Sequence, residues 1–154
     1  MTYGKNALKG KYQLKNPHKY EGKTNQVVYR SSWELKAMNY FDTNSNVLSW
    51  GSEEIVIWYR KPTDNQPHRY FMDFHAKIKM DDGSVKTYLM EIKPDKFTRS
   101  PINTSKSGKP TKSFMKEAIQ YEINQAKWEA ARKVCKEQGW EFLIMTEQDL
   151  GISR

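Results

Sequence analysis

Residues 70–93 read YFMDFHAKIKMDDGSVKTYLMEIK, and this stretch decides the fold that we predict for the chain. Residues 70–79 alternate between apolar side chains at even positions and mostly polar ones at odd positions. Residues 85–93 alternate in a similar way. Such alternation is typical of β-strands, because successive side chains point to opposite faces. The Asp-Asp-Gly turn signal at 81–83 therefore predicts an antiparallel hairpin.

The register of this hairpin decides whether its two acidic residues meet. In a hairpin symmetric about Asp82, a three-residue loop with Gly83 in a left-handed conformation places Asp73 directly opposite Glu91. A two-residue Asp82-Gly83 turn would shift the register by one residue and send the two carboxylates to opposite faces. The sequence leaves both registers open. In the first, Asp73, Glu91 and Lys93 share one face.

Two opposed carboxylates beside a lysine suit a divalent metal site. Opposed acids repel each other across a strand pair, and Lys93 supplies only one compensating charge. Oxygen ligands without a thiolate favour Mg²⁺ or Mn²⁺ over zinc. An ion held by Asp73 and Glu91 could activate a water against a phosphodiester, and Lys93 could orient or help deprotonate that water. The same three residues could instead form ordinary cross-strand salt bridges on an exposed sheet face.

Two helical segments add polar side chains that bear on this site. Glu34 follows Ser31 by three residues, which is the spacing of a capping box at a helix start. Glu34 could also reach the metal centre from that helix. Gln120, Asn124 and Lys127 recur at i, i+4 and i+7 and form a polar stripe on a second helix. That stripe is either a solvated face or a face turned toward DNA or the catalytic centre.

The remaining periodicity predicts a mixed α/β sandwich. A short helix should begin near Ser31 and end near residues 42–46, and a longer one should cover residues 113–138 with Gly139 as its cap. Strands are expected over residues 47–50, 54–59, 70–79, 85–93 and 140–146. This order of elements indicates one mixed central sheet flanked by helices.

Basic charge is concentrated in two segments. The 154 residues include 26 Lys plus Arg against 18 Asp plus Glu, a formal charge of +8. Residues 1–30 and residues 93–116 each hold seven basic residues and one acidic residue. Such clusters suit a polyanion, because phosphate contacts release condensed counterions, although a basic surplus also serves solubility. The candidate DNA contacts are Arg30, Lys96, Arg99, Lys106, Lys109, Lys112, Asn124 and Lys127.

The two basic segments have different expected structures. Residues 1–26 show little periodicity, so we predict an extended or weakly ordered arm. Three tyrosines of that arm could stack on bases: Tyr3, Tyr12 and Tyr20. Residues 94–112 contain almost no large apolar side chain and predict a long mobile loop after Lys93 that could hold a phosphate backbone.

Composition also excludes several classes of protein. Cys135 is the only cysteine, so a disulfide within the chain and a cysteine-rich zinc site are both excluded. A lone thiol favours a reducing compartment. The first twenty residues lack the apolar core of a secretory signal, and no apolar run approaches a membrane-spanning length. We expect no membrane partner, and a place of work in a cytoplasm or in a particle assembled there.

Several motifs occur in an order that resembles a known family. They are Tyr29-Arg-Ser-Ser-Trp-Glu34, Met72-Asp73-Phe74, Glu91-Ile-Lys-Pro94 and the helix-to-strand segment 126–147. Together they resemble the head-completion nucleases of T-even-like tailed bacteriophages. More distantly they are similar to the N-terminal domain of a transposon endonuclease, within the PD-(D/E)xK nuclease superfamily. The resemblance covers roughly residues 11–147.

The resemblance implies a role for each residue of the site. Asp73 and Glu91, with the backbone carbonyl of Ile92, would hold Mg²⁺ or Mn²⁺. Lys93 would be the catalytic lysine. Glu34 would be the acidic residue that the first helix contributes to catalysis.

The resemblance also implies a fold and a biological role. Residues 27–154 would form a single nuclease domain with a restriction-endonuclease-like core, after the basic arm 1–26. Met72 stands where the family's motif has its proline, which is not a metal ligand. The implied activity is metal-dependent endonuclease cleavage of packaged DNA ends, before tail attachment, in the host cytoplasm or the virion. Capsid portal or head–tail connector proteins would be partners. The alternative is a structural head-completion protein that binds DNA ends and has a vestigial nuclease centre.

Overall fold

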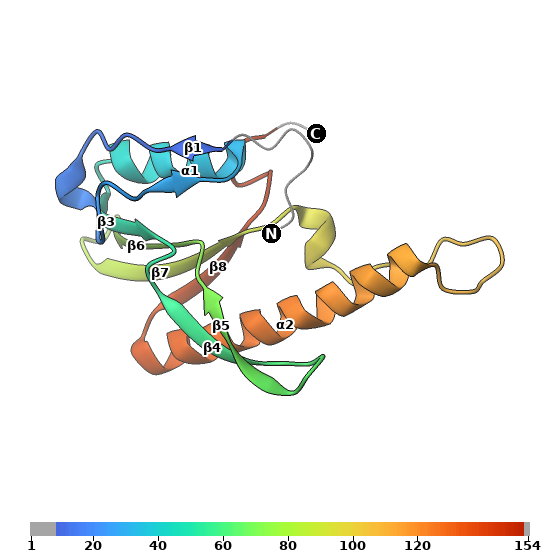
Figure 1. Ribbon diagram of the computed structural model, residues 1–154. Coiled ribbons are helices and arrows are strands. Elements are labelled where there is room, and N and C mark those ends of the chain that lie inside the picture. Colours follow the sequence, from blue (N-terminus) through green and yellow to red (C-terminus); the bar gives the residue numbers. More distant parts are fainter. Residues whose placement is uncertain (1–8, 153–154) are drawn as a thin grey trace.

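A mixed four-stranded sheet forms the centre of the computed structural model, which describes residues 9–152 (Figure 1). Its strands are β3 (Val47–Ser52), β6 (Phe74–Lys79), β7 (Val85–Ile92) and β8 (Glu141–Met145). They lie in the order β3-β6-β7-β8; β6 is antiparallel to both β3 and β7, and β8 is parallel to β7. The predicted α/β fold with a mixed central sheet is confirmed.

Two helices cover the opposite faces of this sheet. Figure 1 shows α1 (Ser32–Thr43) above the sheet and α2 (Lys112–Gln138) below it. On the α1 side, Trp50 and Phe74 are fully buried with Phe41, and on the α2 side Leu89 packs with Trp128. Each face of the sheet therefore contributes apolar side chains to one of two cores.

Both helices begin and end where the sequence predicts. Ser31 is the N-cap of α1, and its Oγ accepts a hydrogen bond from the Glu34 amide at 3.1 Å. Thr111 caps α2 in the same way. Gly139 ends α2 at φ +74°, a left-handed conformation that glycine adopts without steric cost. The chain then turns directly into β8. Neither helix of the described residues is long and apolar enough to cross a bilayer.

A separate two-stranded sheet packs against α2. Its presence corrects the predicted strand over residues 70–79. Its strands are β4 (Val56–Lys61) and β5 (Gln66–Phe71), which pair antiparallel. The single strand predicted over residues 70–79 is wrong, because the chain leaves β5 and enters β6 at Met72 and Asp73. There the Met72 amide donates to the Ile55 carbonyl at 2.9 Å, while the Asp73 carbonyl accepts from Glu53 at 3.2 Å. These bonds belong to neither ladder, so they hold a bend between the two sheets.

The N-terminal segment packs against the rest of the molecule. This finding corrects the prediction of a weakly ordered arm. It contains β1 (Gly10–Lys11), the 3-10 helix η1 (Pro17–Lys19) and β2 (Val28–Tyr29), which pairs with β1. Tyr12 and Tyr20 are buried, and both contact the Trp50 ring edge-on. Residues 9–26 are therefore not a weakly ordered arm, and these two tyrosines serve the core instead of stacking on bases. Tyr3 lies outside the described residues.

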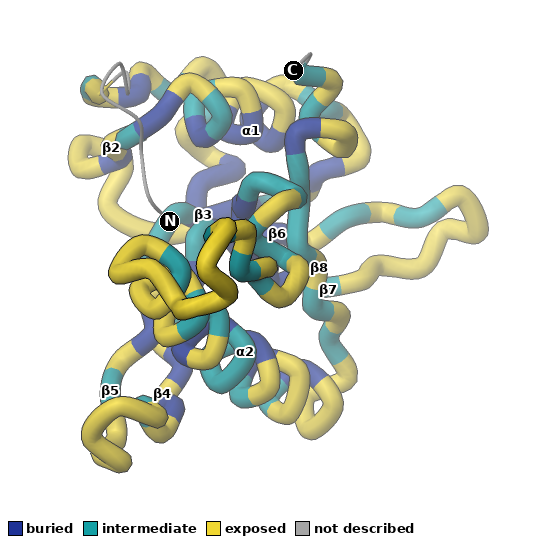
Figure 2. The backbone as a smooth tube through the Cα atoms, turned by 90° about the vertical axis from the view of Figure 1, so that its right-hand side faces the viewer, coloured by how far each residue is buried: buried dark blue, intermediate teal, exposed yellow. Residues whose placement is uncertain are grey.

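The long basic segment between β7 and α2 begins with a single 3-10 turn. This turn, η2 (Asp95–Thr98), is followed by residues 99–111, which form neither helix nor strand. Figure 1 shows the segment before α2 projecting away from the body of the molecule, and Figure 2 shows that it is mostly exposed. The predicted long loop is confirmed. Its basic side chains are therefore presented to solvent at one end of α2.

Candidate active site

The register of the β6–β7 hairpin is the symmetric one. Phe74 pairs with Met90, and the pairing continues without a shift to the turn. There the Met80 amide donates to the Ser84 carbonyl at 2.8 Å, which leaves a loop of three residues. Gly83 takes the left-handed position of that loop, at φ +87°. The three-residue alternative of the two open registers is thus confirmed, and it is the one that brings the acids together.

Asp73 and Glu91 lie together where β6 begins and β7 ends. Asp73 stands one residue before β6, and its Oδ2 accepts a hydrogen bond from the Ile92 amide at 2.8 Å. Enclosure of the carboxyl by protein, followed by the nearby charge of Glu91, raises the pKa of Asp73 well above its usual range. The Ile92 amide opposes that shift without cancelling it. Two acids are thus held close enough to repel each other.

Lys93 and Tyr70 hold the two oxygens of Glu91. Glu91 Oε1 lies 3.5 Å from Lys93 Nζ, and Glu91 Oε2 accepts a hydrogen bond of 2.6 Å from the Tyr70 hydroxyl. Lys93 and Glu91 are each only 4% exposed, so solvent screens their attraction weakly. Burial, and then the charge of Glu91, raise the pKa of Tyr70. The phenol therefore remains protonated at neutral pH and acts as a fixed donor to Glu91.

Tyr70 is a site residue that the sequence analysis missed. Alternation along residues 70–79 assigned it to the apolar face, together with Met72 and Phe74. The bend at Asp73 separates β5 from β6, so the even-numbered side chains of β5 do not lie on the same sheet face as those of β6. The closeness of Tyr70 to Asp73 in the sequence was a signal, because its hydroxyl could reach the opposite carboxylate. Alternation alone does not single out Tyr70 from the apolar residues beside it.

Lys127 reaches the same centre from α2. Its ammonium lies 5.7 Å from the centre of the Tyr59 ring and 5.4 Å from that of the Tyr70 ring, within cation–π range of both. Burial lowers the pKa of Lys127, and the charge of Glu91 partly opposes this shift. The site therefore contains a second lysine, held between two tyrosines of the β4–β5 sheet.

The polar stripe of α2 is not a solvated face throughout. Asn124 is buried, and its Oδ1 accepts a hydrogen bond of 2.9 Å from Gln120 Nε2. Lys127, one turn further along, is half-buried and faces the acids. The solvated-face alternative is thus wrong for these two residues. Gln120 alone of the three is exposed.

Glu34 has a structural role and also lies near the acids. It is 2% exposed, its amide donates to Ser31 Oγ, and its Oε2 accepts from the Arg30 amide at 3.2 Å. The predicted helix cap is confirmed. The charge of Glu34 also contributes, as the smallest cause, to the raised pKa of Asp73. The first helix therefore directs a third carboxylate toward the same region.

Apart from Lys127, the candidate DNA-contacting cations are dispersed. Arg30 pairs with Glu53 at 2.6 Å, beside β2. Lys96 lies in η2, and Arg99 follows it and pairs with Asp95. The others are exposed on the projecting loop and at the start of α2: Lys106, Lys109 and Lys112. Apart from Arg30, these cations lie on or next to the segment that leaves Lys93.

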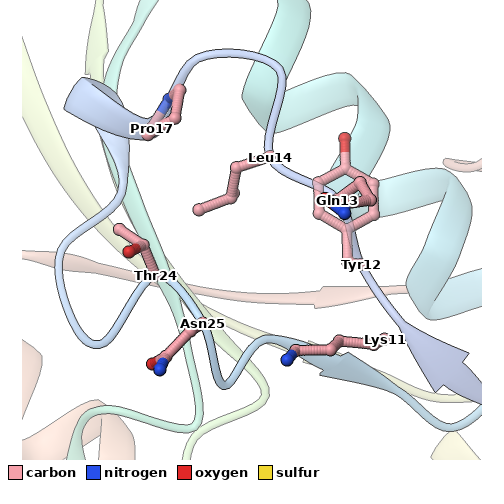
Figure 3. Close-up of a pocket in the computed structure, with 7 residues that line it drawn as sticks. All are labelled: Lys11, Tyr12, Gln13, Leu14, Pro17, Thr24 and Asn25. Atoms are coloured by element: carbon pink, nitrogen blue, oxygen red, sulfur yellow. The ribbon is translucent and has the colours of Figure 1, made fainter.

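A pocket elsewhere in the molecule lacks the groups that hydrolysis requires. It lies in the N-terminal segment, lined by residues 11–14 with Pro17, Thr24 and Asn25 (Figure 3). None of these side chains is a carboxylate, an imidazole or a thiol. Within residues 9–152, no three His, Cys, Asp or Glu side chains converge as a ready-made metal site. A metal at the acidic cluster would therefore draw on two carboxylates together with main-chain oxygen and water.

Comparison with known proteins identifies the family of the chain. The family described as TnsA-like endonuclease N terminal matches residues 44–147, a span that includes all four strands of the central sheet with Asp73, Glu91 and Lys93. The head completion nuclease of Enterobacteria phage T4 is 37% identical over 145 residues, which cover 94% of each chain. On both grounds, the chain belongs to the TnsA-like endonuclease family.

Proposed function

We propose that this protein is a PD-(D/E)xK endonuclease that hydrolyses phosphodiester bonds of DNA and depends on Mg²⁺ or Mn²⁺. The observation that carries the proposal is the meeting of Asp73 and Glu91 at the ends of two paired strands, with Lys93 Nζ 3.5 Å from Glu91 Oε1. Burying an acid pair and an amine lowers the stability of the fold, because the charges lose their hydration. Such an arrangement is typical of functional sites. Membership of an endonuclease family supports the same conclusion.

The donor set fits a hard divalent cation. Burial, and then the charge of Glu91, raises the pKa of Asp73, and a positive ion between the two carboxylates would favour its ionised form. Their carboxylate oxygens, with the carbonyl of Ile92, are the ligands that Mg²⁺ and Mn²⁺ prefer. Glu34 would contribute through a water, because its Oε2 already accepts from the Arg30 amide and the Ser31 hydroxyl. The bound ion would supply a more acidic water and neutralise charge on the scissile phosphate.

The two lysines perform different tasks in this proposal. Lys93 shares a face with Glu91 and orients the attacking water, and its charge stabilises the negative charge that develops on the phosphate. Lys127 is fixed by two aromatic rings, so it offers a preorganised cation to a non-bridging oxygen of the same phosphate. Since both lysines are shielded from water, their attraction for phosphate is weakly screened.

Tyr70 acts through Glu91. By donating to Oε2 it fixes the rotamer of the carboxylate and leaves Oε1 toward Lys93. A hydrogen-bonded partner that orients a metal ligand typically changes metal affinity or activity by about tenfold to a hundredfold when it is removed. Tyr70 is therefore a positioning residue, because it touches a ligand and not the reacting atoms.

Tyr70→Phe should raise the Mn²⁺ concentration for half-maximal plasmid nicking by roughly tenfold, because Glu91 loses its oriented donor. Direct Mn²⁺ binding, measured by electron paramagnetic resonance, should weaken by a similar factor. Tyr88→Phe is the matched control, since its hydroxyl donates to Met80 Sδ at 3.9 Å. Identical Mn²⁺ binding by Tyr70→Phe and Tyr88→Phe would remove Tyr70 from the site.

The biological role that we propose is head completion in a tailed bacteriophage. It rests on the similarity to the T4 head completion nuclease over nearly the whole chain. The protein would act on the ends of packaged DNA before tail attachment, in the host cytoplasm or within the virion. Portal or head–tail connector proteins would be its capsid partners. The basic loop before α2 would hold the DNA backbone beside Lys93.

Cleavage of supercoiled plasmid tests the proposed activity. Purified protein should nick the plasmid with Mg²⁺ or Mn²⁺, and EDTA should stop the reaction, because the acid pair would then lack its cation. Ca²⁺ should support binding better than cleavage, since it takes more ligands in a looser geometry than Mg²⁺. Nicking that persists in EDTA would reject metal dependence. An absence of nicking with either metal, by protein that still binds DNA, would favour the structural alternative.

A further inference from the structure

The β4–β5 sheet has one buried face and one that is unusually apolar and exposed. Its inner side chains, including Tyr59 and Tyr70, pack toward α2. On the outer face Trp58 is 63% exposed and Phe71 is 47% exposed. Val56 lies directly opposite Phe71 in the ladder, so these side chains form one patch and not scattered single residues. Figures 1 and 2 show this hairpin at one corner of the molecule, away from α1.

Two arginines share this outer face with the rings. Arg69 lies opposite Trp58, and its guanidinium is 5.8 Å from the centre of the Phe71 ring. Arg60 follows Trp58 by two residues along β4 and so lies on the same face. Its guanidinium donates to the Asn65 carbonyl at 2.6 Å. All residues of β4 and β5 are described, and neither strand carries a carboxylate. The face therefore combines flat rings with positive charge, and the acid of the connecting turn, Asp64, pairs with His68 at 2.7 Å.

This face begins close to the candidate active site. Tyr70 points inward to Glu91, while its neighbours Arg69 and Phe71 point outward. Asp73 follows Phe71 by two residues, a span of about 7 Å in extended chain. A DNA strand that has its phosphate at the acid pair could thus continue onto the outer face within one or two nucleotides.

We propose that the outer face of β4–β5 binds unpaired DNA next to the cleavage position. Bases would stack on Trp58 and Phe71, and phosphates would contact Arg60 and Arg69. This inference rests on the proposed function in DNA hydrolysis and specifies its substrate. In an intact duplex the base faces are already stacked, so an exposed indole has nothing to stack on there. The preferred substrate is therefore DNA with a single-stranded tail or a frayed end.

Charge favours DNA over a protein partner for this face. A chain of formal charge +8 already attracts phosphate, and the two arginines have no acid beside them on their strands. Trp and Arg are also common at the centres of protein interfaces, so a protein partner is the competing outcome of the test. Because Trp58 and Arg69 are exposed, their replacement should leave the fold intact, which circular dichroism and thermal melting will verify.

Fluorescence anisotropy in EDTA tests the inference without cleavage. The labelled DNAs are a single strand and a duplex with a single-stranded tail, and relaxed covalently closed circular duplex is the unlabelled competitor. Trp58→Ala should weaken binding to both labelled DNAs by roughly tenfold, and Trp58→Phe by less, because the smaller ring still stacks. Competition by closed duplex should not change. Tyr40→Ala is the control, since Tyr40 is an exposed aromatic residue on α1.

The charged part of the face has its own readout. Arg69→Ala should reduce the slope of log affinity against log salt for the tailed duplex by about one, as expected for the loss of one phosphate contact. Lys133→Ala, which removes an exposed charge from α2, should leave that slope unchanged.

The outcomes separate this inference from the proposed function. If wild-type protein nicks plasmid but Trp58→Ala and Tyr40→Ala bind every DNA equally, the strand-binding surface is rejected and the face is assigned to a protein partner. If wild-type protein neither binds nor nicks any DNA, the proposed function fails and the inference fails with it. Selective weakening on unpaired DNA by Trp58→Ala supports the inference.

Discussion

Lys93→Met should nick supercoiled plasmid at roughly a hundredth of the wild-type rate or less, which is the usual effect of deleting one preorganised charge-stabilising group. Methionine keeps most of the volume of the buried lysine stem, so the core around β7 should remain filled. The variant loses the ammonium that lies 3.5 Å from Glu91 and that would face the phosphate. The defect should therefore appear in the maximal rate and persist at saturating Mn²⁺.

Lys86→Met provides the matched control, because Lys86 is an exposed lysine on the same strand. It should nick at the wild-type rate, and thermal melting should show that both variants are folded at the assay temperature. Nicking by Lys93→Met at the rate of Lys86→Met would show that the activity comes from a contaminating nuclease or that Lys93 takes no part. A defect that disappears at high Mn²⁺ would instead indicate a role in metal binding alone.

Asp42→Ala should lower the free energy of unfolding by about 3 kcal/mol, because it leaves a buried hydroxyl and two partly buried amides without an acceptor. Asp42 is fully buried at the end of α1. One of its oxygens accepts from the Tyr12 hydroxyl at 2.9 Å and the Lys15 amide at 2.8 Å, and the other accepts from the Asn16 amide at 3.0 Å. This carboxylate fastens the N-terminal segment to the helix, so its loss should release that segment.

Urea unfolding measures the effect, and Asn39→Ala is the control. Asn39 also lies on α1 and also binds the N-terminal segment, but its Oδ1 accepts from an exposed group, Lys15 Nζ, at 2.8 Å. Such a surface contact should contribute less than about 0.5 kcal/mol. Equal destabilisation by the two substitutions would show that the Asp42 carboxylate does not fasten the N-terminal segment to α1. The Tyr12 main-chain amide donates to the Val27 carbonyl at 2.8 Å, so its hydrogen exchange reports whether the N-terminal segment stays in place. Asp42→Ala should reduce the protection of this amide, and Asn39→Ala should not.

The acid pair could be predicted from local pattern because a hairpin is a local object. Alternation alone fixed which side chains share a strand face, and Gly83 allowed the three-residue turn on which the register depends. The capping spacing of Ser31 and Glu34 is equally local, and it is realised. Each of these features depends on residues that are near one another in sequence or symmetric about a turn.

The features that were missed depend on contacts between distant segments. Met72 continues the alternation of β6, so nothing in the pattern reveals that hydrogen bonds to Ile55 bend the chain there. Tyr70 is recognised as a site residue only once β5 and β7 are placed in space. The burial of Tyr12 depends on Trp50 and Asp42, far along the chain, and the basic composition of its neighbours conceals it.

The parallel pairing of β8 with β7 has a consequence for when the enzyme can become active. The Lys93 amide donates to the Met145 carbonyl at 3.0 Å, so the segment that carries Glu91 and Lys93 is completed by nearly the last residues of the described chain. Lys127 also arrives late, on α2. A ribosome-bound chain that has not yet released these residues cannot assemble the centre. The centre should therefore form only once β8 pairs with β7, so a variant that frees β8 should lose cleavage together with the fixed position of Lys93.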